Sequence, residues 1–197
     1  SPQVSAKIYV KSGSYASNSK ESFTVAWGAR SQDIALNVDL RGKQGWLVPG
    51  HAVSVGDSIT WNGYTIGKVI WKKFGGNFDV ALVERKEPGL FENSYKITDE
   101  LPNGETLPYG GASITNFPQN YAVNAYGGTS GKQTGYIRES NVSINYGSGV
   151  ICEGFIACDY RSNYGDSGAP VWNGIAYVGM QSGSSFNSDG SWAGMSY

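Results

Sequence analysis

The chain has 197 residues, of which only 16% are charged, and its formal net charge is −1 at pH 7. This balance gives no general attraction to nucleic acid or to anionic membranes, and no run of about 18 apolar residues is present to span a bilayer. The high counts of glycine (28) and tyrosine (13) are typical of a β protein with many turns.

Short segments rich in β-branched and aromatic residues recur in the first half. We predict strands at 22–27, 33–39, 45–49, 58–61, 64–71 and 79–84. The stretch "WNGY" at 61–64 contains an Asn-Gly pair, which is typical of a two-residue hairpin turn. His51, the only histidine, follows the third of these strands, and Asp79 begins the last.

Residues 98–112, rich in proline and glycine, form the predicted connection between two halves. In the second half we predict strands at 121–126, 134–140, 141–146, 149–158, 169–172, 175–182 and 191–197. Two batches of short strands indicate an all-β protein with two packed barrels or sandwiches. We place the domains at 1–105 and 106–197.

Ser167 lies in "NYGDSGAPVW", residues 163–172, with a glycine on either side of its Asp-Ser pair. Such a turn can expose a hydroxyl and aim backbone N–H groups at one point, although a plain polar turn would have the same composition. A nucleophilic serine needs a base such as histidine, and a neutral histidine needs a carboxylate to orient it. His51 and Asp79 supply both, because an aspartate that begins an apolar strand is costly to bury unpaired.

Weaker candidates for the carboxylate are Asp33, Asp39 and Asp57.

Cys152 and Cys158 are six positions apart, and we predict a short-loop disulfide between them and an oxidising compartment; two buried thiols are the alternative. A zinc site would need more Cys or His at ligand spacing, so we expect no metal. We expect no organic cofactor.

These motifs together resemble the chymotrypsin-like serine proteases, and most closely the bacterial streptogrisin and α-lytic protease type. The likeness is strongest over 127–185 and extends to "GWLVPGHA" and "NFDVALVE". It implies two antiparallel β-barrels with the active site in the cleft between them. It also implies a serine endopeptidase that forms an acyl-enzyme, with Ser167 as nucleophile, His51 as base and Asp79 as orienting carboxylate. The alternative is a catalytically silent binding module of the same fold.

The resemblance also implies roles for residues around Ser167. The backbone N–H groups of Gly165 and Ser167 would form the oxyanion hole, and Ser182, Gly183 and Ser184 would pair with an extended peptide substrate. The specificity pocket would be lined by Arg161, Ser162, Gln181 and Ser184. A buried Arg161 would favour an acidic substrate side chain, and a solvent-facing Arg161 would leave an apolar slot. Glutamate-specific members of the family use a pocket histidine, but the only histidine of this chain is His51, the predicted base.

The chain departs from the family at several positions. Ala52 replaces a cysteine that often follows the catalytic histidine, and Ala125 replaces an arginine that neutralises the aspartate corresponding to Asp166. Cys158 matches a family cysteine whose usual partner is missing here, so Cys152 is its expected partner. We expect a secreted monomer with peptide substrates, and family members often carry a pro-segment.

Overall fold

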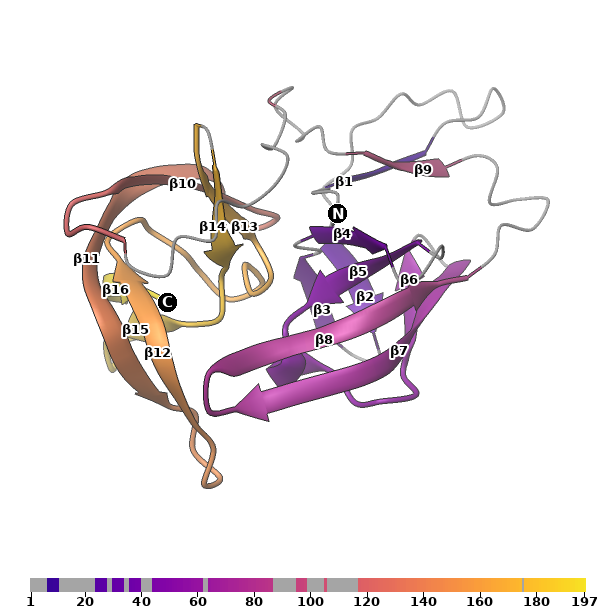
Figure 1. Ribbon diagram of the computed structural model, residues 1–197, viewed down its shortest axis with the longest axis horizontal. Coiled ribbons are helices and arrows are strands. Elements are labelled where there is room, and N and C mark those ends of the chain that lie inside the picture. Colours follow the sequence, from indigo (N-terminus) through magenta and orange to yellow (C-terminus); the bar gives the residue numbers. More distant parts are fainter. Residues whose placement is uncertain are drawn as a thin grey trace.

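The computed structural model describes residues 7–10, 24–27, 30–33, 36–39, 44–61, 64–86, 95–98, 105, 117–174 and 176–197. Its regular elements are strands, with a single turn of 3-10 helix at Gly50–Ala52, so the all-β prediction is confirmed. Within the described part of the chain, no helix is long and apolar enough to cross a membrane. Two seven-stranded sheets lie beside each other, and the sheet built from the second half is strongly curled (Figure 1).

The first sheet has the strand order β3-β2-β6-β7-β8-β5-β4. Its strands are β2 (Thr24–Trp27), β3 (Arg30–Asp33), β4 (Leu36–Asp39), β5 (Gln44–Val48), β6 (Ser58–Trp61), β7 (Tyr64–Gly75) and β8 (Phe78–Arg85). Trp61 pairs with Tyr64, as a two-residue connection requires, while Asn62 and Gly63 lie outside the described residues. The single strand predicted at 33–39 is wrong, because β3 ends at Asp33 and β4 begins at Leu36.

The second sheet has the order β14-β13-β10-β11-β12-β16-β15. Its strands are β10 (Ala122–Gly127), β11 (Gly131–Asn145), β12 (Ile151–Cys158), β13 (Pro170–Asn173), β14 (Ala176–Met180), β15 (Ser184–Phe186) and β16 (Trp192–Ser196). The two strands predicted at 134–140 and 141–146 form one long strand, β11. Its pairing with β12 shifts register at several points, and Asn141 has a φ of 57°, so β11 bends without ending.

A separate two-stranded sheet pairs β1 (Lys7–Val10) with β9 (Tyr95–Thr98). Most of the predicted connection at 98–112 lies outside the described residues, and so does the residue that would begin the second domain.

Alternating burial in β8 explains why Asp79 faces inward. Asp79, Ala81 and Val83 are buried, and they share one face because successive side chains of a strand point to opposite sides.

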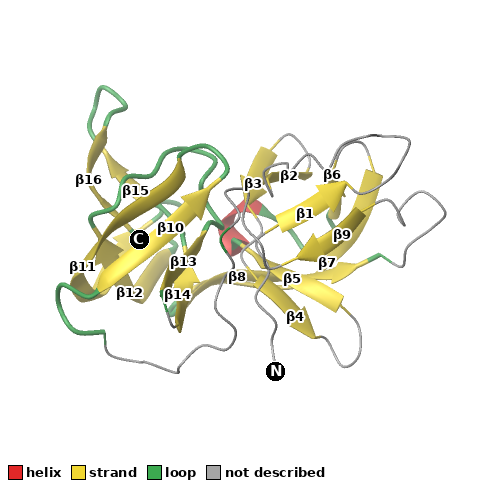
Figure 2. Ribbon diagram, turned by 90° about the horizontal axis from the view of Figure 1, so that it is seen from above, coloured by secondary structure: helices red, strands yellow, loops and turns green. Residues whose placement is uncertain are grey.

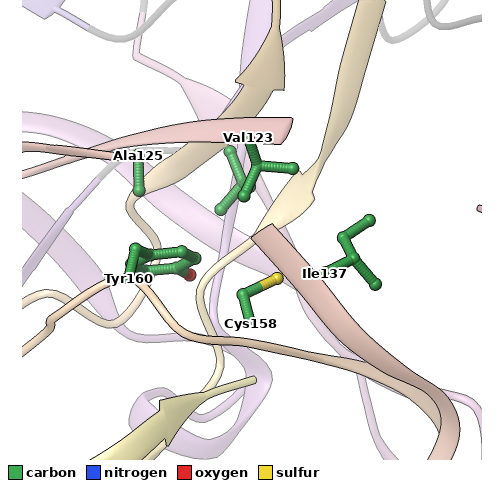
Figure 3. Packing of buried hydrophobic residues seen from close by; sticks show 6 residues of the cluster. Val123, Ala125, Ile137, Cys158 and Tyr160 are labelled. Carbon is green, nitrogen blue, oxygen red and sulfur yellow. The ribbon is translucent and has the colours of Figure 1, made fainter. Parts of the chain in front are cut away.

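The core of the second sheet contains Val123, Ala125, Ile137, Cys158, Tyr160 and Val171 (Figure 3). Burying an aliphatic side chain of this kind contributes about 1.5–3 kcal/mol. The buried face of β8 and this core therefore hold in place the two sheets that carry the site.

The two halves meet where the β7–β8 hairpin touches β12. The N–H of Gly76 donates to the carbonyl of Ile151 at 3.0 Å, and the N–H of Glu153 donates to the carbonyl of Gly76 at 2.7 Å. The thiol of Cys152 lies 3.6 Å from the carbonyl oxygen of Phe78. Figure 2 places the short helical turn, which contains His51, between the two sheets.

The predicted disulfide is wrong, because Cys152 and Cys158 are both free, buried thiols. Both lie on β12, where six strand residues span about 20 Å, far more than the Cα separation of about 6 Å that a disulfide allows. Burial raises the pKa of the Cys158 thiol to about 12, and the negative charge of Asp159 adds to the effect.

Candidate active site

The backbone around His51 is held close against the first sheet. A β-carbon on Gly50 would lie 2.9 Å from both the nitrogen and the oxygen of the Val80 backbone, so only glycine allows this approach. The ammonium of Lys72 donates to the carbonyl of Val53 at 2.6 Å and ties the end of the turn to β7. These contacts hold the turn without the disulfide that a cysteine at the position of Ala52 could form.

His51 and Asp79 form a two-point contact. Nδ1 of His51 lies 2.7 Å from Oδ2 of Asp79, and the backbone N–H of His51 donates to Oδ1, also at 2.7 Å. The Asp79 side chain is 1% exposed, whereas the His51 side chain is 21% exposed. Because a carboxylate only accepts hydrogen bonds, Nδ1 carries the proton, and Nε2 of a neutral His51 is left as an acceptor. The pair thus has the arrangement of a general base and its orienting acid.

Ser182 and Tyr146 extend this contact into the second half of the chain. The Ser182 hydroxyl donates to Oδ2 of Asp79, and it also shares a hydrogen bond with the Tyr146 hydroxyl. The Tyr146 ring stacks on the imidazole of His51, with centroids 5.7 Å apart and planes 21° apart. Burial raises the pKa of Tyr146, so its phenol stays protonated. Sequence reasoning assigned Ser182 to substrate binding and missed Tyr146.

Ser167 lies in a turn between two glycines in the left-handed region, with φ of 93° for Gly165 and 91° for Gly168. Its hydroxyl donates to the carbonyl of Ser182 at 3.3 Å. Among the described residues, no hydrogen bond joins this hydroxyl to His51. Ser182 therefore touches both Asp79, through its side chain, and Ser167, through its backbone.

The turn that carries Ser167 leaves two backbone donors free. The N–H groups of Asp166 and Gly168 donate to backbone carbonyls at 3.1 and 2.7 Å. Those of Gly165 and Ser167 make no hydrogen bond to any residue that the structure describes. Two unpaired N–H groups beside a serine hydroxyl are what an oxyanion hole requires.

Asp166 is 1% exposed, and its carboxylate is held by neutral donors. Oδ1 accepts hydrogen bonds from the N–H groups of Thr129 and Ser130 at 3.0 and 3.1 Å, and Oδ2 accepts from the N–H of Asn163 at 2.9 Å and from the Ser130 hydroxyl. Gly127 provides the space, because a β-carbon there would lie 2.1 Å from Oδ1. These donors satisfy the carboxylate without a cation, so an arginine at the position of Ala125 is not needed.

The predicted specificity residues differ in burial, and Ser184 is half-buried. Arg161 is exposed, which agrees with the solvent-facing alternative of the two that the sequence left open. Ser162 and Gln181 are each 2% exposed. The Ser162 hydroxyl hydrogen-bonds those of Ser184 and Ser196, and the amide nitrogen of Gln181 lies 3.2 Å from Ser162 Oγ. The buried groups are hydroxyls and an amide, without a full charge.

Gly183 lies immediately before β15 and pairs with Tyr197. Its N–H donates to the carbonyl of Tyr197 at 3.3 Å, and its carbonyl accepts from the N–H of Tyr197 at 2.7 Å. Within the described residues, no group of three His, Cys, Asp or Glu side chains is placed to hold a metal ion.

Comparison with known proteins bears on the fold and on the class of protein. No family model matches the chain. Streptogrisin-A of Streptomyces griseus is 26% identical over 170 residues, which cover 83% of this chain and 51% of that protein. Glutamyl endopeptidase 2 of the same organism is 29% identical over 163 residues, covering 80% of this chain and 81% of the relative. The crystal structure of Thermobifida fusca Protease A superposes with a TM-score of 0.71 at 22% identity, covering 88% of this chain and 86% of that one.

The chain resembles bacterial serine proteases in sequence and a bacterial protease in fold. It spans about half the length of streptogrisin-A, so the likeness concerns that part of the relative. The two-sheet architecture of this chain matches the double-barrel fold of Protease A. His51 and Asp79 come from the first sheet's half of the chain, and Ser167 comes from the second.

Proposed function

We propose that this protein hydrolyses peptide bonds with Ser167, His51 and Asp79 as its catalytic triad. The observation that carries the proposal is the hydrogen bond between His51 Nδ1 and Asp79, which leaves Nε2 free on the side of the pair away from the carboxylate. Two unpaired N–H groups beside the Ser167 hydroxyl support it. Catalytic hydrogen bonds are often long before substrate binds, so the resting contact of Ser167 with Ser182 is compatible with this role.

In the proposed reaction, the Ser167 hydroxyl attacks the substrate carbonyl carbon while His51 Nε2 takes its proton. The negative oxygen that forms accepts hydrogen bonds from the N–H groups of Gly165 and Ser167. His51 then gives its proton to the leaving amine, and an acyl-enzyme remains. Water attacks this ester by the same route, with His51 again taking the proton, and the acid product and free Ser167 are released.

The substrate would bind as an extra strand along Ser182–Ser184. Tyr197 occupies one edge of this segment, so an extended peptide would pair with the other edge. The exposed Arg161 and the buried neutral groups of Ser162 and Gln181 argue for an uncharged P1 side chain, because a carboxylate placed among neutral groups is costly to desolvate. The name of glutamyl endopeptidase 2 supports the competing preference for glutamate.

The test is cleavage of a peptide library with P1 varied. We expect the wild-type protein to cut after uncharged residues, and the Ser167→Ala variant to lose at least about a thousandfold in rate, because no nucleophile remains. Ser191→Ala removes the hydroxyl of an exposed loop serine and should cut like the wild type. If none of the three proteins cleaved the library, the silent binding module would be favoured. Cleavage only after glutamate at P1 would overturn the neutral pocket.

A further inference from the structure

We propose that Tyr146 is a positioning residue of the catalytic centre, whose hydroxyl fixes the Ser182 hydroxyl so that Asp79 and, through it, His51 keep their catalytic orientation. This inference rests on the proposed function of the triad. Tyr146 lies in the turn between β11 and β12, so its side chain reaches His51 from the opposite half of the chain.

The direction of each hydrogen bond follows from proton counting. The Asp79 carboxylate has no proton to give, so the single hydroxyl proton of Ser182 must point to Oδ2. Ser182 Oγ then serves as the acceptor toward Tyr146, and Tyr146 is the donor. Hydrogen bonds in such a chain polarise one another, so the phenol strengthens the bond from Ser182 to Asp79.

Oδ2 of Asp79 is the acceptor for both Ser182 and His51 Nδ1. A rotation of the carboxylate that lengthened one of these contacts would disturb the other. By holding the Ser182 hydroxyl, Tyr146 limits that rotation. A free Ser182 hydroxyl could instead turn toward water or toward a backbone carbonyl.

The Tyr146 backbone is itself fixed. Its N–H donates to the carbonyl of Val150 at 3.0 Å, and the next N–H, of Gly147, donates to the Asn145 side chain at 2.8 Å. The ring packs edge-on against Phe74 of β7, with centroids 5.1 Å apart. The phenol therefore lies on a rigid support shared by both halves, as a positioning role needs.

Burial raises the pKa of Tyr146 most; the hydrogen bond with Ser182 lowers it, and Asp79 and Cys152 raise it further. His51, which stacks on the ring, is the other titratable group beside the phenol. The phenol therefore remains a donor at every pH at which a neutral His51 could act as the base.

The first experiment compares Tyr146→Phe with the wild type in steady-state hydrolysis. The phenylalanine ring preserves the stacking on His51 and removes only the hydroxyl. We expect kcat to fall by about three- to tenfold with KM unchanged, because one hydrogen bond of a coupled set is lost. The acidic limb of the kcat/KM profile should move to higher pH, because loss of the phenol weakens the hydrogen bond from Ser182 to Asp79. The carboxylate then stabilises the protonated form of His51 more strongly. Tyr136→Phe, at a 46% exposed site on β11, should match the wild type.

A double-mutant cycle separates positioning from packing. If Tyr146 acts through Ser182, then Tyr146→Phe should have no further effect in a Ser182→Ala background. An undiminished effect there, or wild-type kinetics of Tyr146→Phe, would overturn the inference.

A second readout does not depend on turnover. His51 is the only histidine, so the imidazole proton on Nδ1 gives one assignable NMR signal in inactive Ser167→Ala protein. Adding Tyr146→Phe should shift this signal, while adding Tyr136→Phe should not. An unshifted signal would refute the role of Tyr146, even if the chain proved to have no protease activity. Absence of turnover in the wild type would instead refute the proposed function.

Discussion

Ser130 donates its hydroxyl proton to Asp166, the residue immediately before Ser167. Together with three backbone N–H groups, this hydroxyl surrounds a carboxylate that is almost completely buried. Hydrogen bonds to the ionised form can hold a buried carboxylate without a cation. The turn that presents Ser167 is therefore anchored to the segment between β10 and β11.

We predict that Ser130→Ala will loosen this turn. The variant leaves one carboxylate oxygen with a lone backbone donor, and we expect the free energy of unfolding to fall by about 1–3 kcal/mol. We also expect weaker binding of a peptide boronic acid, which occupies the oxyanion position. Ser130→Thr, which keeps the hydroxyl, should recover most of both losses, and Ser143→Ala, at an exposed site on β11, should change neither. Full boronate affinity in Ser130→Ala would contradict the anchoring role.

A second prediction concerns the close approach at Gly50. In Gly50→Ala, the new β-carbon would meet backbone atoms of Val80 and Lys73 that cannot move independently of the sheet. The turn must shift away, and His51 with it, so kcat/KM should fall at least about tenfold and stability by about 1–3 kcal/mol. Gly174→Ala, where the added carbon meets nothing within 4 Å, is the matched control. Equal activity of the two variants would show that the turn tolerates displacement.

The two free cysteines lead to a third prediction. Without reductant, Ellman's reagent should react slowly with the native protein, because both thiols are buried and their pKa values are raised by burial. After denaturation in guanidinium, two thiols per chain should react. A count of zero in denaturant would restore the disulfide that the sequence suggested.

Burial of Cys158 also predicts a loss of stability in alkali. Its pKa is about 12 in the folded chain, against a usual value of 9.0, so the unfolded chain releases this proton first as pH rises. The free energy of unfolding should therefore fall above about pH 9, by about 1–2 kcal/mol at pH 10 from this group alone. Urea unfolding at pH 8 and pH 10 measures the change, and Cys158→Ala should reduce it. The same drop in both proteins would assign the effect to other buried groups, such as Tyr160.

The sequence predicted the pattern-based parts of the fold well. The apolar strand that Asp79 begins indicated that its carboxylate is paired, and the Asn-Gly pair predicted the hairpin between β6 and β7. The sequence divided β11 into two strands, because turn-forming residues lie near its centre, at Asn141. In the structure the pairing with β12 continues across this bend. Secretion, a pro-segment and a monomeric state remain predictions from the sequence.

In the site, the local motifs were predictable and the contacts made across the chain were not. The "GDSG" turn located Ser167 and its two free N–H groups. Ser130 and Tyr146 carry no signal of their own, because their roles depend on partners 36 positions away, at Asp166 and Ser182. The disulfide failed because Cys152 and Cys158 lie on one strand, β12, and the strand predicted at 149–158 was already at odds with a short-loop bridge.

The most direct test of the triad is labelling with a fluorophosphonate, followed by mass spectrometry of the modified peptide. A fluorophosphonate reacts only with a serine that a neighbouring base activates. We predict that the wild-type protein is modified at Ser167 and that His51→Ala reduces the labelling rate by at least about a hundredfold. Ser167 left unmodified in the folded wild-type protein, or modified equally fast without His51, would contradict the account.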